Sequence, residues 1–400
     1  MPLGLANRLS SVAPSMTMKV TAKAAELRAQ GVEVISFAAG EPDFDTPSHI
    51  KEAAKRALDN GATKYTAVEG TPQLRKAVAE WFARAHGFAV SAGEVMVSAG
   101  AKQVIHNAFH ALLDAGDEVI LPAPCWVSYA EIAKLAGATP VPVLSRAADN
   151  FALDPDAIAR AITPATRMIV LCSPSNPTGA IYDELTLRAI ADLALKRDLW
   201  LLTDDIYRSL CYGGARIVQP ATFGPDIRRR TIIVDGVSKT YAMTGWRIGF
   251  CLAPAEVIEG MATLQGQSTT NAAAVSQAAA LAAIEGPSDE LETMRLEFDK
   301  RRKYMLAGLR DMPGVACTEP KGAFYAFPDV SAFLGKRSKQ GRLIADDLDL
   351  CQYLIEEDKI AVVPGSAFFA PGFVRLSYAT AQPNIEKGLA RMARALAELV

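Results

Sequence analysis

The pattern of apolar and polar positions along the chain predicts helices and strands that alternate. Apolar residues recur at helical spacing in segments 49–59, 71–86 and 101–113. Short runs rich in β-branched residues are separated by helical patterns such as 131–136 and 185–196. We predict strands over residues 95–98, 118–121, 139–143, 167–171, 199–203 and 231–235. Because these runs are typical of buried strands in a mostly parallel sheet, the chain is predicted to be an α/β protein.

The pattern changes after Glu285. A charged helical segment covers residues 288–310, and a strand-like segment follows at 322–327. Further strands are predicted near Ala361 and Val374. This change indicates a second, smaller α/β unit. The predicted division places a large domain in residues 48–290 and a small domain in residues 1–47 together with 291–400.

The composition limits the classes of protein and partner. Half of the 400 residues are hydrophobic and the formal net charge is −2, which argues against a disordered chain and against a nucleic-acid-binding surface. The six cysteines form no CxxC pair and do not cluster with the four histidines, so neither a metal site nor a disulfide framework is predicted. No stretch approaches the roughly 18 apolar residues of a membrane span. We expect small-molecule substrates, no nucleic-acid or membrane partner, and a cytoplasmic location.

The segment that is most informative about chemistry is 236–249, GVSKTYAMTGWRIG, which directly follows the predicted strand 231–235. A lone lysine at such a place is usually a solvated surface residue. Here small residues precede Lys239, and Arg247 lies in a Gly-x-Arg-x-Gly sequence. A lysine that forms a Schiff base needs a desolvated position, which lowers its pKa, and a nearby arginine can bind a cofactor phosphate with two N–H groups. The segment therefore favours a reactive lysine.

Segment 236–249 resembles, position for position, the lysine signature of the class I (fold type I) aminotransferases that depend on pyridoxal 5'-phosphate (PLP). The resemblance extends from Pro14 to the C-terminal helix and is greatest to the bacterial aspartate branch of the family. It implies a large domain with a mostly parallel seven-stranded sheet and a smaller α/β domain. It also implies a homodimer that binds PLP as a Schiff base with Lys239.

The resemblance assigns the contacts with the cofactor ring to four side chains. Asp204 would pair with the pyridine nitrogen and Tyr207 would contact the 3-oxygen, so both are expected to be catalytic together with Lys239. Asn176 would bind the same oxygen, and Trp126 would stack on the ring. Taken alone, these residues are also typical of a helix N-cap, a packing tyrosine, a proline-stiffened loop and a core aromatic, respectively.

A turn of small residues joins the predicted strand 95–98 to the helix that begins near residue 101. Free N–H groups at a helix N-terminus attract phosphate, although such a turn alone is a weak signal. In the resembling family this turn binds the cofactor phosphate. The residues implicated here are Gly100, Ala101, Lys102, Ser238 and Arg247. The chain departs from residues common in the family at Cys125, Ala130, Asp205 and Gly236, and the last change removes a hydroxyl from the phosphate site.

The substrate contacts implied by the resemblance are centred on Arg375. A buried guanidinium is costly unless it meets water or a carboxylate, and the motif around Arg375 resembles the one that binds the substrate α-carboxylate. The other substrate-binding residues implied are Gly40, Trp126, Asn176, Lys102 and Thr17. Among these, Lys102 would neutralise the distal carboxylate of aspartate, with help from Thr17.

The implied reaction moves the amino group of L-aspartate to 2-oxoglutarate, which gives oxaloacetate and L-glutamate. Tyr65 corresponds to the tyrosine that reaches the cofactor phosphate of the neighbouring subunit, although a tyrosine before a turn is also typical of packing. Three alternatives stay open at the level of sequence: an aminotransferase for aromatic or prephenate-type substrates, a carbon–sulfur β-lyase of the same fold type, and a non-catalytic binding module.

Overall fold

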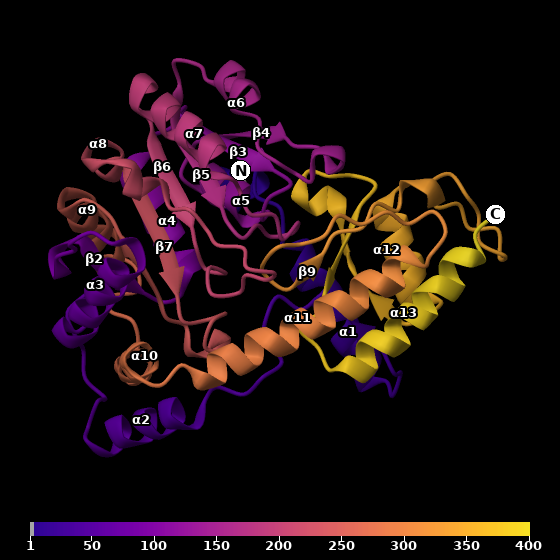
Figure 1. The fold of residues 1–400 in the computed structure, drawn as a ribbon, viewed down its shortest axis with the longest axis horizontal. Coiled ribbons are helices and arrows are strands. Elements are labelled where there is room, and N and C mark those ends of the chain that lie inside the picture. The colour runs from indigo at the N-terminus through magenta and orange to yellow at the C-terminus, as the bar shows by residue number, and fades with distance from the viewer. Residues whose placement is uncertain (1–3) are drawn as a thin grey trace.

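A seven-stranded sheet forms the larger of two connected bodies in the computed structural model, which describes residues 4–400 (Figure 1). The strand order is β2-β8-β7-β6-β5-β3-β4. The strands are β2 (Val95–Ser98), β3 (Glu118–Ala123), β4 (Thr139–Leu144), β5 (Thr166–Cys172), β6 (Trp200–Asp204), β7 (Thr231–Gly236) and β8 (Gly249–Leu252). Neighbours from β4 to β7 are parallel, whereas β8 runs antiparallel to both β7 and β2. The predicted α/β class and mostly parallel seven-stranded sheet are confirmed.

All six strands predicted for this sheet are present, with small shifts at their ends. The seventh strand, β8, was not predicted. It is short and follows a loop of small and polar residues, and nothing in its apolar pattern indicates an antiparallel direction. Its position nevertheless matters for the site, because β8 returns the chain from Lys239 into the sheet between β2 and β7.

Helices cover both faces of the sheet. Val119 and Leu202 pack on one face with α4 (Ala101–Leu112) and α9 (Ala255–Gly266). Ile120 and Leu201 pack on the other face with α6 (Pro155–Ala161) and α7 (Glu184–Arg197). Since successive strand residues point to opposite faces, burial of both faces explains the unbroken apolar runs. The other helices of this body are α2 (Ser48–Asp59), α3 (Pro72–His86), α5 (Ser128–Leu135), α8 (Pro225–Arg228) and α10 (Ala274–Glu285).

The smaller body combines the two ends of the chain. Its helices are α1 (Met16–Ala29), α11 (Asp289–Arg310), α12 (Asp347–Glu356) and α13 (Gln382–Ala397), and its strands are β1 (Ile35–Ser36), β9 (Tyr325–Ala326), β10 (Ile360–Ala361), β11 (Val363–Pro364) and β12 (Val374–Ser377). Strand β1 pairs with β10 in parallel, and β12 lies between β11 and β9 with both neighbours antiparallel. The strand predicted over 322–327 is reduced to β9, because Ala323 has a φ of +59°, which is not strand backbone, and Gly322 before it forms only an isolated bridge with Cys211 of the larger body. The domain boundaries at 47/48 and 290/291 stay predictions.

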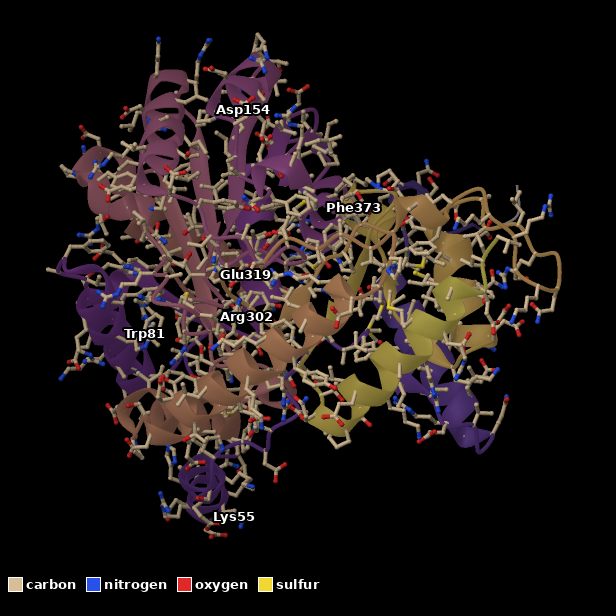
Figure 2. All side chains as sticks on the ribbon, turned by 45° about the vertical axis from the view of Figure 1, so that its right-hand side comes forward. Lys55, Trp81, Asp154, Arg302, Glu319 and Phe373 are labelled. Carbon is tan, nitrogen blue, oxygen red and sulfur yellow. The ribbon has the colours of Figure 1, made fainter. Side chains whose placement is uncertain are left out.

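Helix α11 connects the two bodies, running from beside α10 to beside α13 (Figure 1). Its sequence is strongly charged, yet Arg301 and Arg302 are buried where it crosses. Figure 2 shows Arg302 and Glu319 near this crossing. Over residues 4–400 the structure has no helix with both the length and the apolar character that a bilayer span requires.

Candidate active site

The candidate site lies at the carboxyl ends of parallel strands β5, β6 and β7, where ligand sites of open α/β sheets are found. Lys239 follows β7, and its Nζ donates a hydrogen bond of 2.5 Å to the carbonyl oxygen of Gly40. Burial lowers the pKa of Lys239 to about 8; the negative charge of Glu41 opposes the shift, and Arg247 and Arg375 add to it. An amine with this pKa is partly neutral near pH 8 and can act as a nucleophile or base.

Asp204 ends β6 and is almost fully buried. Its Oδ2 accepts a hydrogen bond of 2.6 Å from the Tyr129 hydroxyl, and its Oδ1 accepts one of 3.2 Å from the N–H of Ile206. Burial raises the pKa of Asp204, and these two bonds and Lys239 favour the ionised form. Tyr129 is a site residue that the sequence pattern does not reveal, because a tyrosine in an apolar helix is usually a packing residue.

Tyr207 follows Asp204 in the loop after β6, and its hydroxyl lies 2.8 Å from the hydroxyl of Tyr325 in β9. Both side chains are buried, and burial raises the pKa of Tyr207 well above its usual value. Tyr207 therefore stays neutral and keeps a proton to donate. Tyr325 is a second residue missed by sequence reasoning, because its contact joins two bodies that are distant in sequence.

The turn before α4 lies close to the guanidinium of Arg247. A Cβ on Gly100, whose φ is +92°, would lie 2.6 Å from Nη2 of Arg247. A Cβ on Gly249 of β8 would lie 2.1 Å from the backbone N of Ala101. These two glycines let the guanidinium and β8 approach the first N–H groups of α4, where an anion is favoured. Ser238, predicted to belong to this group, is buried next to Lys239.

Arg375 in β12 is buried, with 2% of its surface exposed. Its Nη1 donates to Oδ1 of Asn176 at 3.0 Å, and its Nη2 donates to the carbonyl of Ala38 at 2.9 Å. Its Nε has no hydrogen-bond partner among residues 4–400. A Cβ on Gly40 would lie 3.2 Å from the Tyr325 hydroxyl. The predicted carboxylate-binding residues Arg375, Asn176 and Gly40 therefore lie in one neighbourhood with an N–H group still to be satisfied.

Lys102, in the first turn of α4, places its Nζ 4.8 Å from the centre of the Trp126 ring. Burial lowers the pKa of Lys102, and the positive charge of Arg247 adds to this effect. Trp126 in turn meets Tyr129 edge to face, with ring centres 5.3 Å apart. Lys102 and Trp126 are thus linked through Tyr129 to Asp204, as expected if all four line one site.

Two predicted residues are not joined to this site within a single chain. The side chain of Tyr65 is 89% exposed. Thr17 lies in the first turn of α1, where its carbonyl accepts a hydrogen bond of 2.9 Å from the hydroxyl of Thr21. The assigned roles of these and the other site residues stay predictions.

Comparison with known proteins decides the family. The family described as aminotransferase class I and II matches residues 32–392. The chain belongs to the class I and II aminotransferases. The aspartate/prephenate aminotransferase of Cereibacter sphaeroides is 46% identical over 97% of either chain. The structure of the aspartate aminotransferase from Rhizobium meliloti covers all of both chains with a TM-score of 0.95 and 44% identity. That of Thermus thermophilus with maleate covers 98% of this chain and 100% of that one, with a TM-score of 0.92 and 43% identity.

As a member of this family, the aminotransferase depends on PLP. The residues present fit this cofactor. The glycine-lined turn at Gly100 and the guanidinium of Arg247 suit its phosphate, and the buried carboxyl of Asp204 suits its ring nitrogen. The amine of Lys239, with a lowered pKa, suits its aldehyde.

Proposed function

We propose that this aminotransferase transfers the amino group of L-aspartate to 2-oxoglutarate. The observation that carries the proposal is the placement of three cations at the site: Arg247 faces the turn at Gly100, Arg375 bonds to Asn176, and Lys102 lies 4.8 Å from the Trp126 ring centre. A cofactor phosphate would neutralise Arg247 and a substrate α-carboxylate would neutralise Arg375. Lys102 is then left for a second substrate carboxylate, which favours a dicarboxylic amino acid.

Bound PLP supplies an aldehyde that accepts the amino group and a ring that withdraws electrons from the substrate Cα. Lys239 would remove the proton from Cα, since its lowered pKa leaves part of the amine neutral near pH 8. Asp204, held by Tyr129, would keep a proton on the ring nitrogen, and Tyr207 and Asn176 would contact the ring oxygen. Arg375 would bind the α-carboxylate with its two forked nitrogens and so orient the Cα–H bond for cleavage.

The proposal is tested by mixing PLP-loaded protein with single amino acids and following the change in cofactor absorbance. Aspartate and glutamate should react faster than alanine or phenylalanine. A large preference for phenylalanine or a sulfur amino acid would overturn the aspartate assignment. Lys239→Ala should abolish this half-reaction, and an unaffected rate in that variant would exclude the role of Lys239. Pyruvate and ammonia formed without an oxo-acid acceptor would indicate a β-lyase instead.

A second substrate class follows from one relative. The name of the Cereibacter sphaeroides enzyme includes prephenate, and it is 46% identical to this chain. Prephenate also carries two carboxylates, so Arg375 and Lys102 would suit it by the same charge argument. Amino transfer from aspartate to prephenate, measured beside transfer to 2-oxoglutarate, decides whether both acceptors are used.

We also propose a homodimer in which Tyr65 reaches the cofactor phosphate of the partner. The exposure of Tyr65 supports this, because an 89% exposed tyrosine is free to contact a second chain. The test mixes two variants, Lys239→Ala and Tyr65→Ala. If Tyr65 acts across the interface, mixed dimers contain one intact site and activity returns on mixing. If Tyr65 acts within its own chain, mixing restores nothing.

The expected cytoplasmic location also remains a proposal. All six cysteines are free thiols, and four of them are buried. Free thiols of this kind are usual in a reducing compartment.

A further inference from the structure

Three segments that carry candidate site residues meet behind the site. They are segments 176–179, 207–210 and 322–325, which carry Asn176, Tyr207 and Tyr325. We call the contact between Gly179, Leu210 and Gly322 the joint. Each of these three residues lies three positions from the site residue of its own segment. A shift at the joint would therefore move all three site side chains.

Backbone hydrogen bonds close the joint. The N–H groups of Lys321 and Gly322 both donate to the carbonyl of Gly179, at 2.8 and 3.0 Å. The N–H of Ala323 donates to the carbonyl of Leu210 at 2.9 Å. The segment that leads to β9 is thus bonded to loops after β5 and β6 of the larger body. These bonds cross between the two bodies, so their geometry sets how Tyr325 meets Tyr207.

The packing at the joint leaves no space for side chains. A Cβ on Gly179 would lie 2.3 Å from Cβ of Pro320. A Cβ on Gly322 would lie 2.4 Å from Cγ of Pro174 and 2.8 Å from the carbonyl oxygen of Leu210. Contacts this close transmit displacement, because densely packed atoms cannot yield separately.

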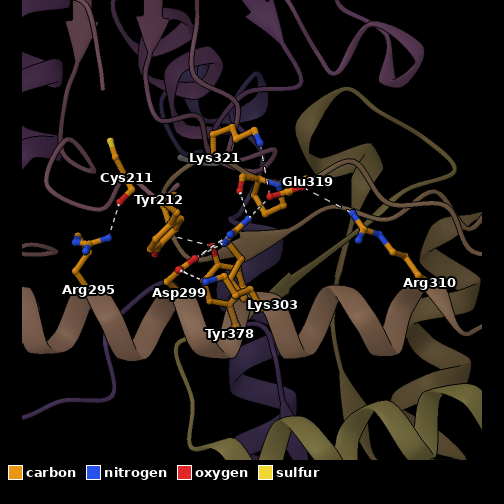
Figure 3. Close-up of polar contacts among 12 residues, drawn as sticks. Cys211, Tyr212, Arg295, Asp299, Lys303, Arg310, Glu319, Lys321 and Tyr378 are labelled. Carbon is orange, nitrogen blue, oxygen red and sulfur yellow. Dashed lines mark hydrogen bonds and ion pairs between the residues drawn. The ribbon is translucent and has the colours of Figure 1, made fainter. Parts of the chain in front are cut away.

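Arg302 of α11 bonds to the segment that leads into the joint from the smaller body. Figure 3 shows its partners Asp299 and Glu319, with Tyr212 nearby. Its Nη1 donates to Oε1 of Glu319 at 2.8 Å and to the carbonyl of Pro320 at 3.1 Å. Its Nε and Nη2 both lie 2.8 Å from Oδ1 of Asp299. The guanidinium is 5.2 Å from the ring centre of Tyr212, and only 4% of the residue is exposed. A buried guanidinium with these bonds fixes its partners more firmly than an exposed ion pair does.

We infer that Arg302 is a positioning residue for the substrate site, because it fixes segment 319–323 and, through the joint, the places of Asn176 and Tyr325 beside Arg375. Asn176 bonds to Arg375 at 3.0 Å, and the Tyr325 ring lies 4.4 Å from the Arg375 guanidinium carbon. Loss of Arg302 therefore loosens both neighbours of the arginine expected to bind the α-carboxylate. The inference rests on the proposed function only for the choice of aspartate as the substrate.

The test compares Arg302→Met with Arg310→Met in the PLP-loaded protein. Arg310 lies on the same helix and also faces Glu319, at 3.9 Å, but it is exposed. In Arg302→Met we expect faster hydrogen exchange at the amides of Lys321, Gly322 and Ala323 with unchanged exchange in β6. We also expect KM for aspartate to rise about 10-fold, with kcat changed less, since the loosened residues neighbour the α-carboxylate site and Lys239 and Asp204 keep their places. Arg310→Met should change neither quantity.

Two further variants keep the test decisive. Arg302→Lys retains the positive charge but not the paired N–H groups of the guanidinium, so KM for aspartate should rise less than in Arg302→Met. Glu319→Gln weakens the same network without a cavity and should move exchange and KM in the same direction by less. Unchanged exchange at the joint together with unchanged KM in Arg302→Met and Glu319→Gln would overturn the inference. Equal loss of protection in β6 and at the joint would also overturn it, by showing general destabilisation. Failure of the wild type to react with aspartate would refute the proposed function and leave the exchange result valid.

Discussion

The hydroxyl of Tyr129 donates a hydrogen bond of 2.6 Å to Asp204, and both side chains are buried. Tyr129→Phe removes the donor, so the pKa of Asp204 should rise further. Hydrogen bonds to charged groups contribute about 1.5–3 kcal/mol, so the aspartate half-reaction should slow about 10- to 100-fold. Single-turnover absorbance between pH 5 and pH 9 should show the largest loss at low pH. Tyr304→Phe, at a half-exposed position on α11, is the control. A pH-independent loss would argue against this role.

Lys239 should reduce the stability of the cofactor-free protein below pH 8. Its pKa is lowered from 10.5 to about 8, so the native state excludes a proton that the unfolded chain holds between these values. The wild type should therefore gain stability relative to Lys239→Met as pH rises from 8 toward 10.5, by about 2 kcal/mol after allowance for partial solvent exposure. Urea unfolding of both proteins at pH 7.5, 9 and 10 measures this gap. A constant difference would contradict the lowered pKa.

Lys102 should control the preference for dicarboxylic amino acids. Lys102→Met is expected to reduce kcat/KM for aspartate about 10-fold, because a partly buried charge pair is lost, and to leave alanine almost unaffected. Since the pKa of Lys102 is lowered, the wild-type preference for aspartate should also weaken at alkaline pH. Lys76→Met, at an exposed position on α3, controls for loss of one positive charge. Parallel losses for aspartate and alanine would place Lys102 outside substrate recognition.

Arg375→Lys keeps the positive charge of the candidate carboxylate site but removes the paired N–H groups of the guanidinium. The buried position leaves lysine unable to satisfy both Asn176 and a substrate carboxylate, so KM for aspartate and alanine should rise together by about 100-fold. Steady-state kinetics with both amino acids measures the change. Arg228→Lys is the matched control. Arg228 pairs with Glu94 near the amino ends of β2 and β7, away from the candidate site. A selective effect on aspartate would instead indicate contact with the distal carboxylate.

Gly100→Ala should weaken cofactor binding for a steric reason. Its Cβ would lie 2.6 Å from Arg247, whereas a Cβ on Gly116, with a similar φ of +96°, would meet nothing within 4 Å. Both changes strain the backbone, but only the first displaces the guanidinium. Equilibrium titration with PLP should show a dissociation constant raised about 10-fold for Gly100→Ala relative to Gly116→Ala. Equal affinities would mean that Arg247 does not bind the phosphate.

The sequence predicted most of the sheet, because strands buried on both faces give apolar runs that are readable one at a time. It did not predict α10, which is rich in alanine and lies against α2 and α3 without a polar face that reveals its period. The site contacts of Tyr129 and Tyr325 were not predicted, for a different reason. Their partners, Asp204 and Tyr207, are far away in sequence, and a tyrosine gives no local sign that its hydroxyl is bonded.

The predicted site residues also divide into those that local sequence patterns could bring together and those that they could not. Lys239, Asp204 and the turn at Gly100 follow strands that could be located, so their convergence at one sheet edge was foreseeable. The contact between Arg375 and Asn176 joins the two bodies, and only the resemblance to a family suggested it. Neither a local pattern nor a contact in the described chain ties Thr17 and Tyr65 to the site, so their proposed roles rest on the resemblance alone.

The antiparallel direction of β8 separates the part of the chain that would hold the cofactor from the part that would hold the substrate α-carboxylate. Gly236 and Gly249 are partners in the β7–β8 pairing, so the loop carrying Lys239 and Arg247 is clamped at both ends by the same rigid hairpin. Binding of the cofactor by these two residues would thereby be determined within the larger body. Binding of the substrate α-carboxylate would depend instead on Arg375 of β12 in the other body, so changes there would alter substrate affinity while Lys239 and Arg247 keep their places.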